Sequence, residues 1–122
     1  MPTSRTELGN WGEGLARRML QGKGYAVLTT NYRCRWGEID IVAQEGAELV
    51  FVEVRTRSSS DYGTPEESVT EAKVQRLVAT AQDYIQSLGD DTVSWRIDLV
   101  SVRTGRFGKL HRIDHLKYAV QL

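Results

Sequence analysis

The spacing of apolar positions predicts two helices with a run of strands between them. Over residues 5–21 apolar side chains recur every three or four positions, which indicates one apolar face of a helix that ends at the glycines after it. The same spacing returns after Thr70, a residue that can cap a helix, and continues to about Leu88. Gly89 follows directly and favours the end of this second helix.

Short segments rich in β-branched and aromatic residues predict strands, and Gly46 suits the first central position of a type II′ turn between two of them. The stretch 58–65 is rich in residues typical of loops. The segments expected to form strands are 25–32, 36–44, 48–57 and 92–102, with a short fifth strand at 109–114. The order helix, three strands, helix, strand predicts an α/β fold with a mixed sheet flanked by helices.

The composition favours a single domain over residues 1–122, since 40% apolar and 26% charged residues are usual for a globular protein. The longest aliphatic or aromatic run is four residues. A membrane helix needs about 20, and we see no secretory signal. The single Cys34 excludes an internal disulfide. We therefore expect a cytoplasmic protein with no membrane partner.

Charge is balanced in total but uneven along the chain. The 16 basic and 16 acidic residues cancel, which argues against a histone-like protein that binds DNA by net charge. Acids outnumber bases over residues 61–91, and bases outnumber acids over residues 96–122. Of the 16 bases 12 are arginine, which suits bidentate recognition of phosphate or carboxylate. A surface of mixed charge without such a role is an equally open interpretation.

A turn at Gly46 and Ala47 would fix the register of the hairpin between the second and third strands. One face then contains only apolar pairs, and we expect it to face the core. These pairs are Ile39 with Val54, Ile41 with Val52, and Ala43 with Val50. The opposite face would pair Asp40 with Glu53, Glu38 with Arg55, and Val42 with Phe51.

The opposed carboxylates of Asp40 and Glu53 point to a cation site, because like charges directly across a sheet are destabilising. Mg²⁺ commonly uses one or two carboxylates together with substrate phosphate and water. Arg55 could hold a phosphate oxygen or stabilise charge at phosphorus. Glu13 falls at the edge of the apolar face of the first helix and is a candidate third carboxylate. The alternative is a surface ladder of salt bridges through Glu38 and Arg55 that contributes little.

The motifs carry a family resemblance. Glu13, the segment GEIDIV at 37–42 and the segment FVEVR at 51–55 resemble the PD-(D/E)xK nuclease pattern. More closely, about residues 5–120 resemble the YraN family of bacterial proteins. The segments that carry this resemblance are GEGLA at 12–16, GY at 24–25, NYR at 31–33, GEIDIVA at 37–43, FVEVRTR at 51–57 and RIDLV at 96–100.

That family is similar to archaeal Holliday-junction resolvases in fold and motif order. The resemblance implies a restriction-endonuclease-like αβββαβ core, cleavage of phosphodiester bonds with Mg²⁺ or Mn²⁺, and Glu13, Asp40 and Glu53 as metal ligands. The chain departs from the nuclease pattern at Arg55, where the pattern has lysine. An arginine cannot be deprotonated in a protein and cannot serve as a general base. Lys73 could supply an amine instead, although an ordinary surface lysine in the first turn of a helix is the simpler interpretation.

Basic and aromatic residues on the same strands form a candidate nucleic-acid surface. They could line a groove for backbone phosphates and unstacked bases. The basic residues are Arg33, Arg35, Arg55 and Arg57, with Lys73 as a further contact, and the aromatic residues are Tyr32, Trp36 and Tyr62. The aromatic side chains could equally belong to the core or its rim.

Two further features carry weaker expectations. Asp98 alternates with apolar neighbours on its strand, and we expect it to pair with Arg96 or a neighbouring arginine. His111 and His115 have the i, i+4 spacing of a zinc pair on a helix, but no convincing further ligands accompany them. Cys34 has no histidine partner in its sequence context and is interpreted as incidental.

Three functions from different classes follow. The first is an endonuclease that hydrolyses DNA with Mg²⁺ or Mn²⁺, with branched DNA among its substrates and, as in resolvases, a homodimer that cuts two related strands. The second is a nucleic-acid-binding module that keeps the nuclease-like fold without cleavage, which Arg55 favours. The third is a scaffold for partner proteins, for which the acidic segment 61–91 is the only hint.

Overall fold

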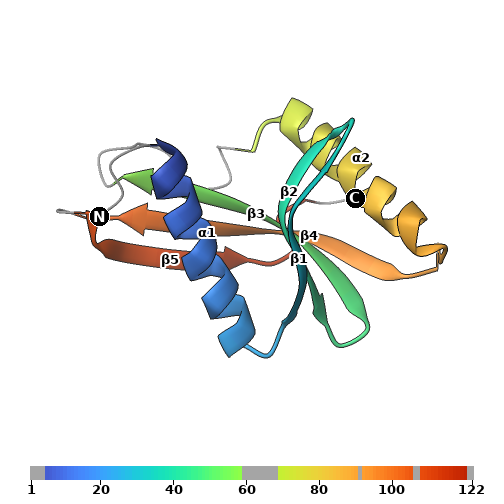
Figure 1. Cartoon of the computed structure of the whole chain (residues 1–122), viewed down its shortest axis with the longest axis horizontal. Coiled ribbons are helices and arrows are strands. Elements are labelled where there is room, and N and C mark those ends of the chain that lie inside the picture. The colour runs from blue at the N-terminus through green and yellow to red at the C-terminus, as the bar shows by residue number, and fades with distance from the viewer. Residues whose placement is uncertain (1–4, 59–68, 91, 106–107, 121–122) are drawn as a thin grey trace.

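The computed structural model describes residues 5–58, 69–90, 92–105 and 108–120, which form a β-sheet with a helix on each face (Figure 1). This arrangement confirms the α/β fold that the sequence predicts. The elements are α1 (Arg5–Gly22), β1 (Ala26–Cys34), β2 (Gly37–Glu45), β3 (Glu48–Ser58), α2 (Glu71–Leu88), β4 (Ser94–Thr104) and β5 (Leu110–Leu116).

The sheet is mixed, with the strand order β1-β2-β3-β4-β5. Strands β3 and β4 are parallel, and the other neighbouring pairs are antiparallel. Parallel neighbours require a crossover connection, which here contains α2. The topology is consistent with the predicted restriction-endonuclease-like core.

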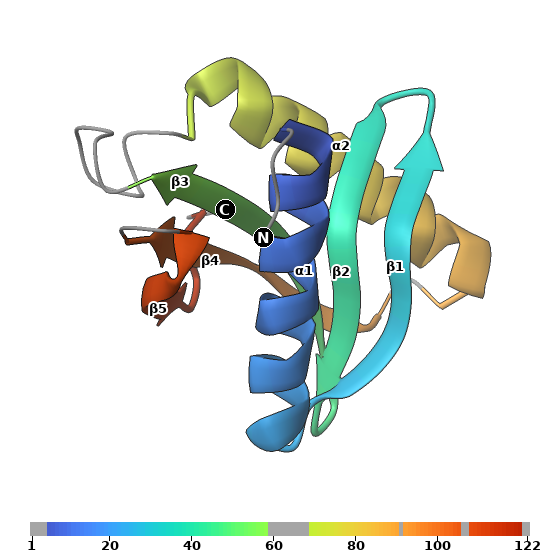
Figure 2. The same ribbon diagram turned by 60° about the vertical axis from the view of Figure 1, so that its left-hand side comes forward.

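Each helix covers its own face of the sheet (Figures 1 and 2). One buried cluster joins Ala16 and Leu20 of α1 to apolar side chains of the inner strands. A second cluster joins Leu77, Ala81 and Ile85 of α2 to the opposite face. The predicted cap of α2 is confirmed, since the Thr70 hydroxyl accepts a hydrogen bond from the Lys73 N–H at 3.3 Å.

The face of the β2–β3 hairpin opposite the expected core face is also buried in part. Val42 and Phe51 lie on that face, and both are buried because α2 packs against them. On this face the polar residues lie near Asp40 and Glu53, and the remaining pair is apolar. The polar stretch of this face is therefore confined to one end of the hairpin.

Helix α1 passes very close to β3. A Cβ atom at Gly12 would lie 1.9 Å from the Thr56 hydroxyl oxygen, so only glycine fits this contact. The close approach carries the next residue, Glu13, to the sheet.

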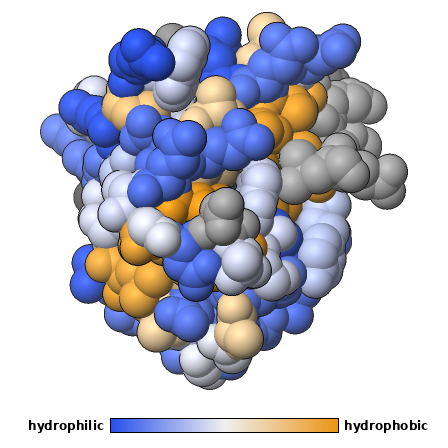
Figure 3. Space-filling model, turned by 90° about the vertical axis from the view of Figure 1, so that its right-hand side faces the viewer, coloured by the Kyte–Doolittle hydropathy of each residue, from blue (hydrophilic) through white to orange (hydrophobic). Residues whose placement is uncertain are grey.

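The helices of the described residues include none that is long and apolar enough to cross a membrane. The face in Figure 3 bears hydrophilic side chains over most of its area, with apolar patches between them.

Candidate functional site

The candidate site lies where β2 and β3 separate. The predicted pairs of Ile41 with Val52 and Ala43 with Val50 are confirmed. The ladder ends at Ile41, and the Asp40 carboxylate accepts a hydrogen bond from the Val54 N–H at 2.7 Å. The Asp40 carboxylate thus replaces a backbone carbonyl of β2 as the hydrogen-bond acceptor of the Val54 N–H.

The predicted pair of Val42 with Phe51 is also confirmed, whereas the separation corrects the pairs predicted beyond Ile41. Asp40 does not pair with Glu53 across the ladder, and Ile39 packs in the α2 cluster, away from Ile41. Glu38 pairs with Arg33 of β1 at 3.1 Å, where the sequence predicted Arg55 as its partner. Because Ile39 and Ile41 pack on opposite faces of the sheet, the regular alternation of side chains along β2 is interrupted at Asp40.

Asp40 carries the strongest electrostatic signal of the site. Burial and the charges of Glu53, Glu13 and Glu38 together raise the pKa of this carboxyl to about 7, although the hydrogen bond from the Val54 N–H lowers it. A carboxyl that is buried beside like charges and titrates near neutrality is typical of functional sites.

Glu13 is held in place by β1. One of its carboxylate oxygens accepts a hydrogen bond from the Asn31 side-chain amide at 2.9 Å. Burial raises the pKa of Glu13, the Asn31 hydrogen bond lowers it, and the charge of Glu38 raises it. The placement agrees with the predicted position of Glu13 at the edge of the apolar face of the helix.

Glu53 lies toward α2, where Lys73 contacts it. The Lys73 Nζ and a Glu53 carboxylate oxygen are 3.4 Å apart, and their side chains are 23% and 12% exposed. Lys73 is therefore not an ordinary surface lysine. Its ammonium contacts Glu53, the carboxylate that in the nuclease pattern comes two positions before a lysine. In this chain the lysine comes from α2 and not from β3.

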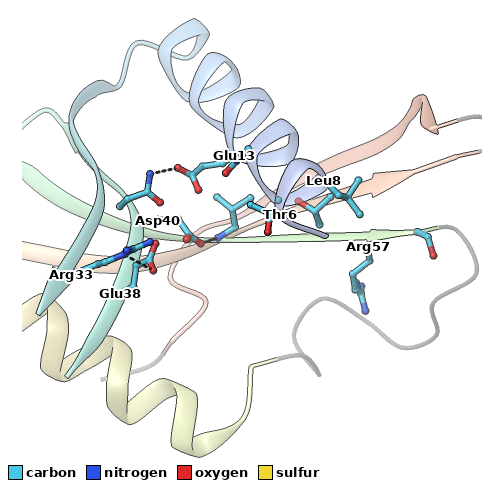
Figure 4. A pocket seen from close by; sticks show the side chains of 13 residues that line it. Thr6, Leu8, Glu13, Arg33, Glu38, Asp40 and Arg57 are labelled. Carbon is cyan, nitrogen blue, oxygen red and sulfur yellow. Dashed lines mark hydrogen bonds and ion pairs between the residues drawn. The ribbon is translucent and has the colours of Figure 1, made fainter. Parts of the chain in front are cut away.

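A hollow of about 580 Å³ opens between α1, the β1–β2 hairpin and β3. Figure 4 shows Asp40 between Glu13 and Glu38, with Arg33 beside Glu38. Arg57 also lines the hollow, whereas Glu53 and Arg55 are absent from its described wall. Three carboxylates and two guanidinium groups thus share one cavity that is open to solvent.

Two arginines of β3 have buried donors without partners. Within the described residues, Arg55 Nε and Arg57 Nε and Nη2 make no hydrogen bond. A buried donor without an acceptor costs about 1–3 kcal/mol, and more when it is charged. Anionic oxygens such as those of a phosphate would satisfy these donors.

The other predicted contacts are divided between two places. Arg33 is at the hollow, 74% exposed and paired with Glu38. Arg35 lies at the tip of the β1–β2 hairpin, where its guanidinium stacks on Trp36. Tyr32 belongs to the α2 side, since its hydroxyl donates to Asp83. Tyr62 lies outside the described residues.

The carboxylates around Asp40 are the candidate ligands of a divalent metal. Among the residues that the structure describes, no three acidic, histidine or cysteine side chains converge closely enough to hold an ion. Mg²⁺ keeps several waters and needs only one or two protein carboxylates. Asp40 and Glu53 are the candidate pair, because the charge of Glu53 has the largest charge effect on the pKa of Asp40.

Two residues near the site escaped the sequence prediction. Asn31 adopts a φ of 55° within β1, a conformation that asparagine tolerates better than most residues. Arg17 lies one helical turn after Glu13 and lines a smaller adjoining hollow with it. The signal for Arg17 was its i, i+4 spacing from Glu13, and the signal for Asn31 was an amide residue within a strand.

The two histidines with helical spacing do not lie on a helix. His111 and His115 lie on strand β5, and the His115 Nε2 is 2.7 Å from an Asp98 oxygen. Asp98 also binds Arg96 at 2.9 Å, as predicted from the sequence. This network lies within the fold and uses both histidine nitrogens, since Lys23 contacts the other at 3.1 Å.

A comparison with protein families decides the relationship of the chain. The family described as "Uncharacterised protein family UPF0102" matches residues 12–102, a range that includes Glu13, Asp40, Glu53 and Lys73. The chain belongs to UPF0102. This assignment confirms the family resemblance of the sequence motifs and adds no activity, because the family is described as uncharacterised.

Similar proteins extend over nearly the whole chain. A UPF0102 protein of Roseiflexus castenholzii is 46% identical, with 99% of this chain and 98% of the relative covered. One of Chloroflexus aurantiacus is 45% identical, with 98% of each covered. One of Moorella thermoacetica is 44% identical, with 98% of this chain and 99% of the relative covered. These UPF0102 relatives bear names without a stated reaction.

Proposed function

We propose that this UPF0102 protein is an endonuclease that hydrolyses DNA phosphodiester bonds with Mg²⁺ or Mn²⁺. The carrying observation is the buried carboxyl of Asp40 among other carboxylates, with a pKa of about 7, beside a cavity that also presents arginines. A cluster with more acids than paired cations opposes the stability of a fold and favours the binding of a cation. The arginines suit the anion that would arrive with it.

Asp40 and Glu53 would hold the metal, with Glu13 near enough to bind one of its waters. When bound, the ion would lower the pKa of an attacking water and stabilise negative charge on the phosphate. The Val54 N–H fixes one oxygen of Asp40, and no described residue donates a hydrogen bond to the other. Asn31 holds Glu13 in the same way, so both carboxylates are oriented before a substrate arrives.

The basic residues would position the scissile phosphate. Arg57 has two buried donor atoms without partners at the cavity, and Arg55 has one on the same strand. Lys73 orients Glu53 and offsets part of the repulsion between Glu53 and Asp40. The nuclease pattern has lysine at position 55, where this chain has an arginine that cannot be deprotonated. A lysine such as Lys73 keeps an amine, the group that is missing at position 55.

A second function is a module that binds nucleic acid without cutting it. The ion pair of Lys73 with Glu53 favours this alternative, because it already supplies a cation to one of the two carboxylates. Arg55 in place of lysine points in the same direction. Both functions use the same cavity and the same arginines.

Cleavage of labelled duplex, single-stranded, flapped and four-way-junction DNA with Mn²⁺ or Mg²⁺ separates the two functions. We expect cutting by the wild type, with a loss of more than about 100-fold in Glu53→Ala and Asp40→Asn. Asp114→Asn is the matched control, since this strand acid pairs with Arg112 on β5 and lies outside the site. Binding without cleavage by any variant would support the binding module, and equal cutting by all variants would exclude the proposed site.

A further inference from the structure

Trp36 stands at the tip of the β1–β2 hairpin. The two-residue turn of Arg35 and Trp36 is closed by the pairing of Cys34 with Gly37. The Trp36 ring system is 46% exposed, an unusual position for the largest apolar side chain. Its backbone N–H donates to the Cys34 sulfur at 3.4 Å, which helps to fix the turn.

The tip is braced against α2. Gly37 has a φ of 150°, and a Cβ atom there would lie 3.3 Å from the buried Thr80 hydroxyl. The Thr80 hydroxyl in turn donates to the Arg76 carbonyl at 2.7 Å. Trp36 is therefore presented on a backbone that is held close to a helix.

Two shallow hollows flank Trp36 on the surface of α2. The first, about 350 Å³, is lined by Trp36, Ala72, Gln75, Arg76 and Ala79. The second, about 290 Å³, is lined by Arg35, Trp36, Ala79, Gln82, Asp83 and Gln86. The first combines an aromatic wall, two small alanines, an amide and a guanidinium group, which suits a flat heterocycle attached to an anion.

The charges around Trp36 favour an anionic polymer. The Arg35 guanidinium lies 4.5 Å from the Trp36 ring, and Arg76 reaches the first hollow from α2. The one acid of the second hollow, Asp83, accepts the hydroxyl hydrogen bond of Tyr32. Phosphate groups would therefore meet two exposed arginines beside the ring.

The residues of this surface are close along the chain to those of the candidate site. Ala72 of the first hollow directly precedes Lys73, which contacts Glu53. Trp36 precedes Asp40 by four residues, a separation of roughly 13 Å along an extended strand. A single strand of a few nucleotides would reach from the carboxylates to the ring.

We infer that Trp36 and the first hollow bind an unpaired nucleobase on the strand that leaves the Asp40 site. This inference rests on the proposed function and specifies its substrate: DNA with a single-stranded segment next to the scissile bond. The base stacks on Trp36, and Arg35 and Arg76 contact the neighbouring phosphates. Stacking on an aromatic side chain accepts any base, so the site recognises unpaired structure and not sequence.

The test is DNA binding in EDTA, where cleavage cannot occur. Fluorescence anisotropy would compare a labelled 12-nucleotide single strand with a blunt duplex. We expect Trp36→Ala to weaken single-strand binding about 5- to 100-fold and to change duplex binding by less than about twofold. Trp36→Phe keeps a stacking ring and should retain most of the affinity. Leu28→Ala is the control, because Leu28 is also 46% exposed.

The outcomes separate this inference from the proposed function. Equal losses with both DNAs, no loss in Trp36→Ala, or no single-strand binding by the wild type would overturn the base site. If the wild type still cuts DNA in those cases, the proposed function stands without it. Selective loss in Trp36→Ala with rescue by Trp36→Phe supports the base site even if cleavage is never observed.

Discussion

Two aspartates on strands of the same sheet have opposite surroundings. Asp98 is fully buried and binds Arg96, His115 and the Tyr118 N–H. Burial raises its pKa, but hydrogen bonds from His115 and Arg96 outweigh that effect and leave the pKa below its usual value. Asp40 has the Val54 N–H as its partner and other carboxylates as neighbours, and its pKa rises to about 7.

The comparison shows that burial alone does not distinguish a structural acid from a functional one. Asp98 is fully buried and Asp40 is partly buried, and the larger difference lies in their partners. Asp98 directly faces the guanidinium of Arg96, which also binds Glu45 and Glu48 at 3.0 and 2.6 Å. The Asp40 cluster has more acid than its described partners neutralise. Local groups that oppose stability are expected at functional sites.

The largest expected loss of stability comes from breaking the hydrogen-bonded network around Asp98. Asp98→Asn removes the charge that Arg96 and His115 face, and a buried charge is left with poorer compensation. We expect a loss of about 3 kcal/mol in the free energy of unfolding, measured by urea denaturation at pH 7. Because the pKa of Asp98 is lowered, its contribution is present above about pH 4 and is lost as the pH falls further. A loss under about 1 kcal/mol would contradict the contrast with Asp40.

Lys73→Met removes a positive charge from the acidic cluster around Asp40. It leaves Glu53, whose side chain is 12% exposed, without its cation. We expect a loss of about 1.5 kcal/mol in the free energy of unfolding without metal, recovered in part by millimolar Mg²⁺. Lys73→Arg keeps the charge and serves as the control. A loss that Mg²⁺ leaves unchanged would mean that the cluster does not bind the ion.

Asp40→Asn should have the opposite sign. Asparagine can still accept the Val54 hydrogen bond, while the repulsion with Glu53 and Glu13 disappears. The raised pKa of Asp40 means that its stabilising contribution is present below about pH 4 and is lost as the pH rises to about 7. We therefore expect the variant to gain about 1 kcal/mol over the wild type at pH 8 and less at pH 4, in metal-free urea titrations.

A loss of about 2 kcal/mol or more in Asp40→Asn at pH 8 would make Asp40 a structural acid like Asp98. Asp40→Ala distinguishes the charge from the hydrogen bond. It leaves the Val54 N–H without its acceptor and should be less stable than Asp40→Asn by about 1 kcal/mol.

The smallest effect on stability is expected at the rim. Arg33→Ala removes an ion pair whose arginine is 74% exposed. We expect less than about 0.5 kcal/mol of stability to be lost, because exposed pairs contribute little. DNA affinity should fall, and the slope of affinity against salt should decrease by about one phosphate contact. Unchanged DNA affinity would separate Arg33 from the proposed nucleic-acid surface.

Much of the fold could be predicted because each element carries its own local signal. Thr70 and Gly89 bound α2 as expected, and the turn at Gly46 has a φ of 59°. The separation of β2 from β3 could not be predicted from alternation, because it depends on one side chain, Asp40, taking a backbone hydrogen bond. The burial of Phe51 under α2 likewise depends on packing between distant segments.

The candidate site could be predicted in its residues but not in its arrangement. Glu13, Asp40 and Glu53 carry a recognisable pattern, and the charge of each of the two glutamates acts on Asp40. The pairing of Lys73 with Glu53 joins a helix to a strand twenty residues earlier, and no local spacing encodes it. Arg33 and Glu38 were both noted in the sequence, but their pairing follows the β1–β2 register.

Metal binding by the Asp40 cluster tests the proposed function most directly. Isothermal titration calorimetry with Mn²⁺ at pH 8 would compare the wild type, Asp40→Asn and the control Asp114→Asn. We expect Mn²⁺ to bind to the wild type and to Asp114→Asn, with a loss of at least about tenfold in affinity in Asp40→Asn. Equal Mn²⁺ affinity in all three proteins, or no binding by the wild type, would contradict it.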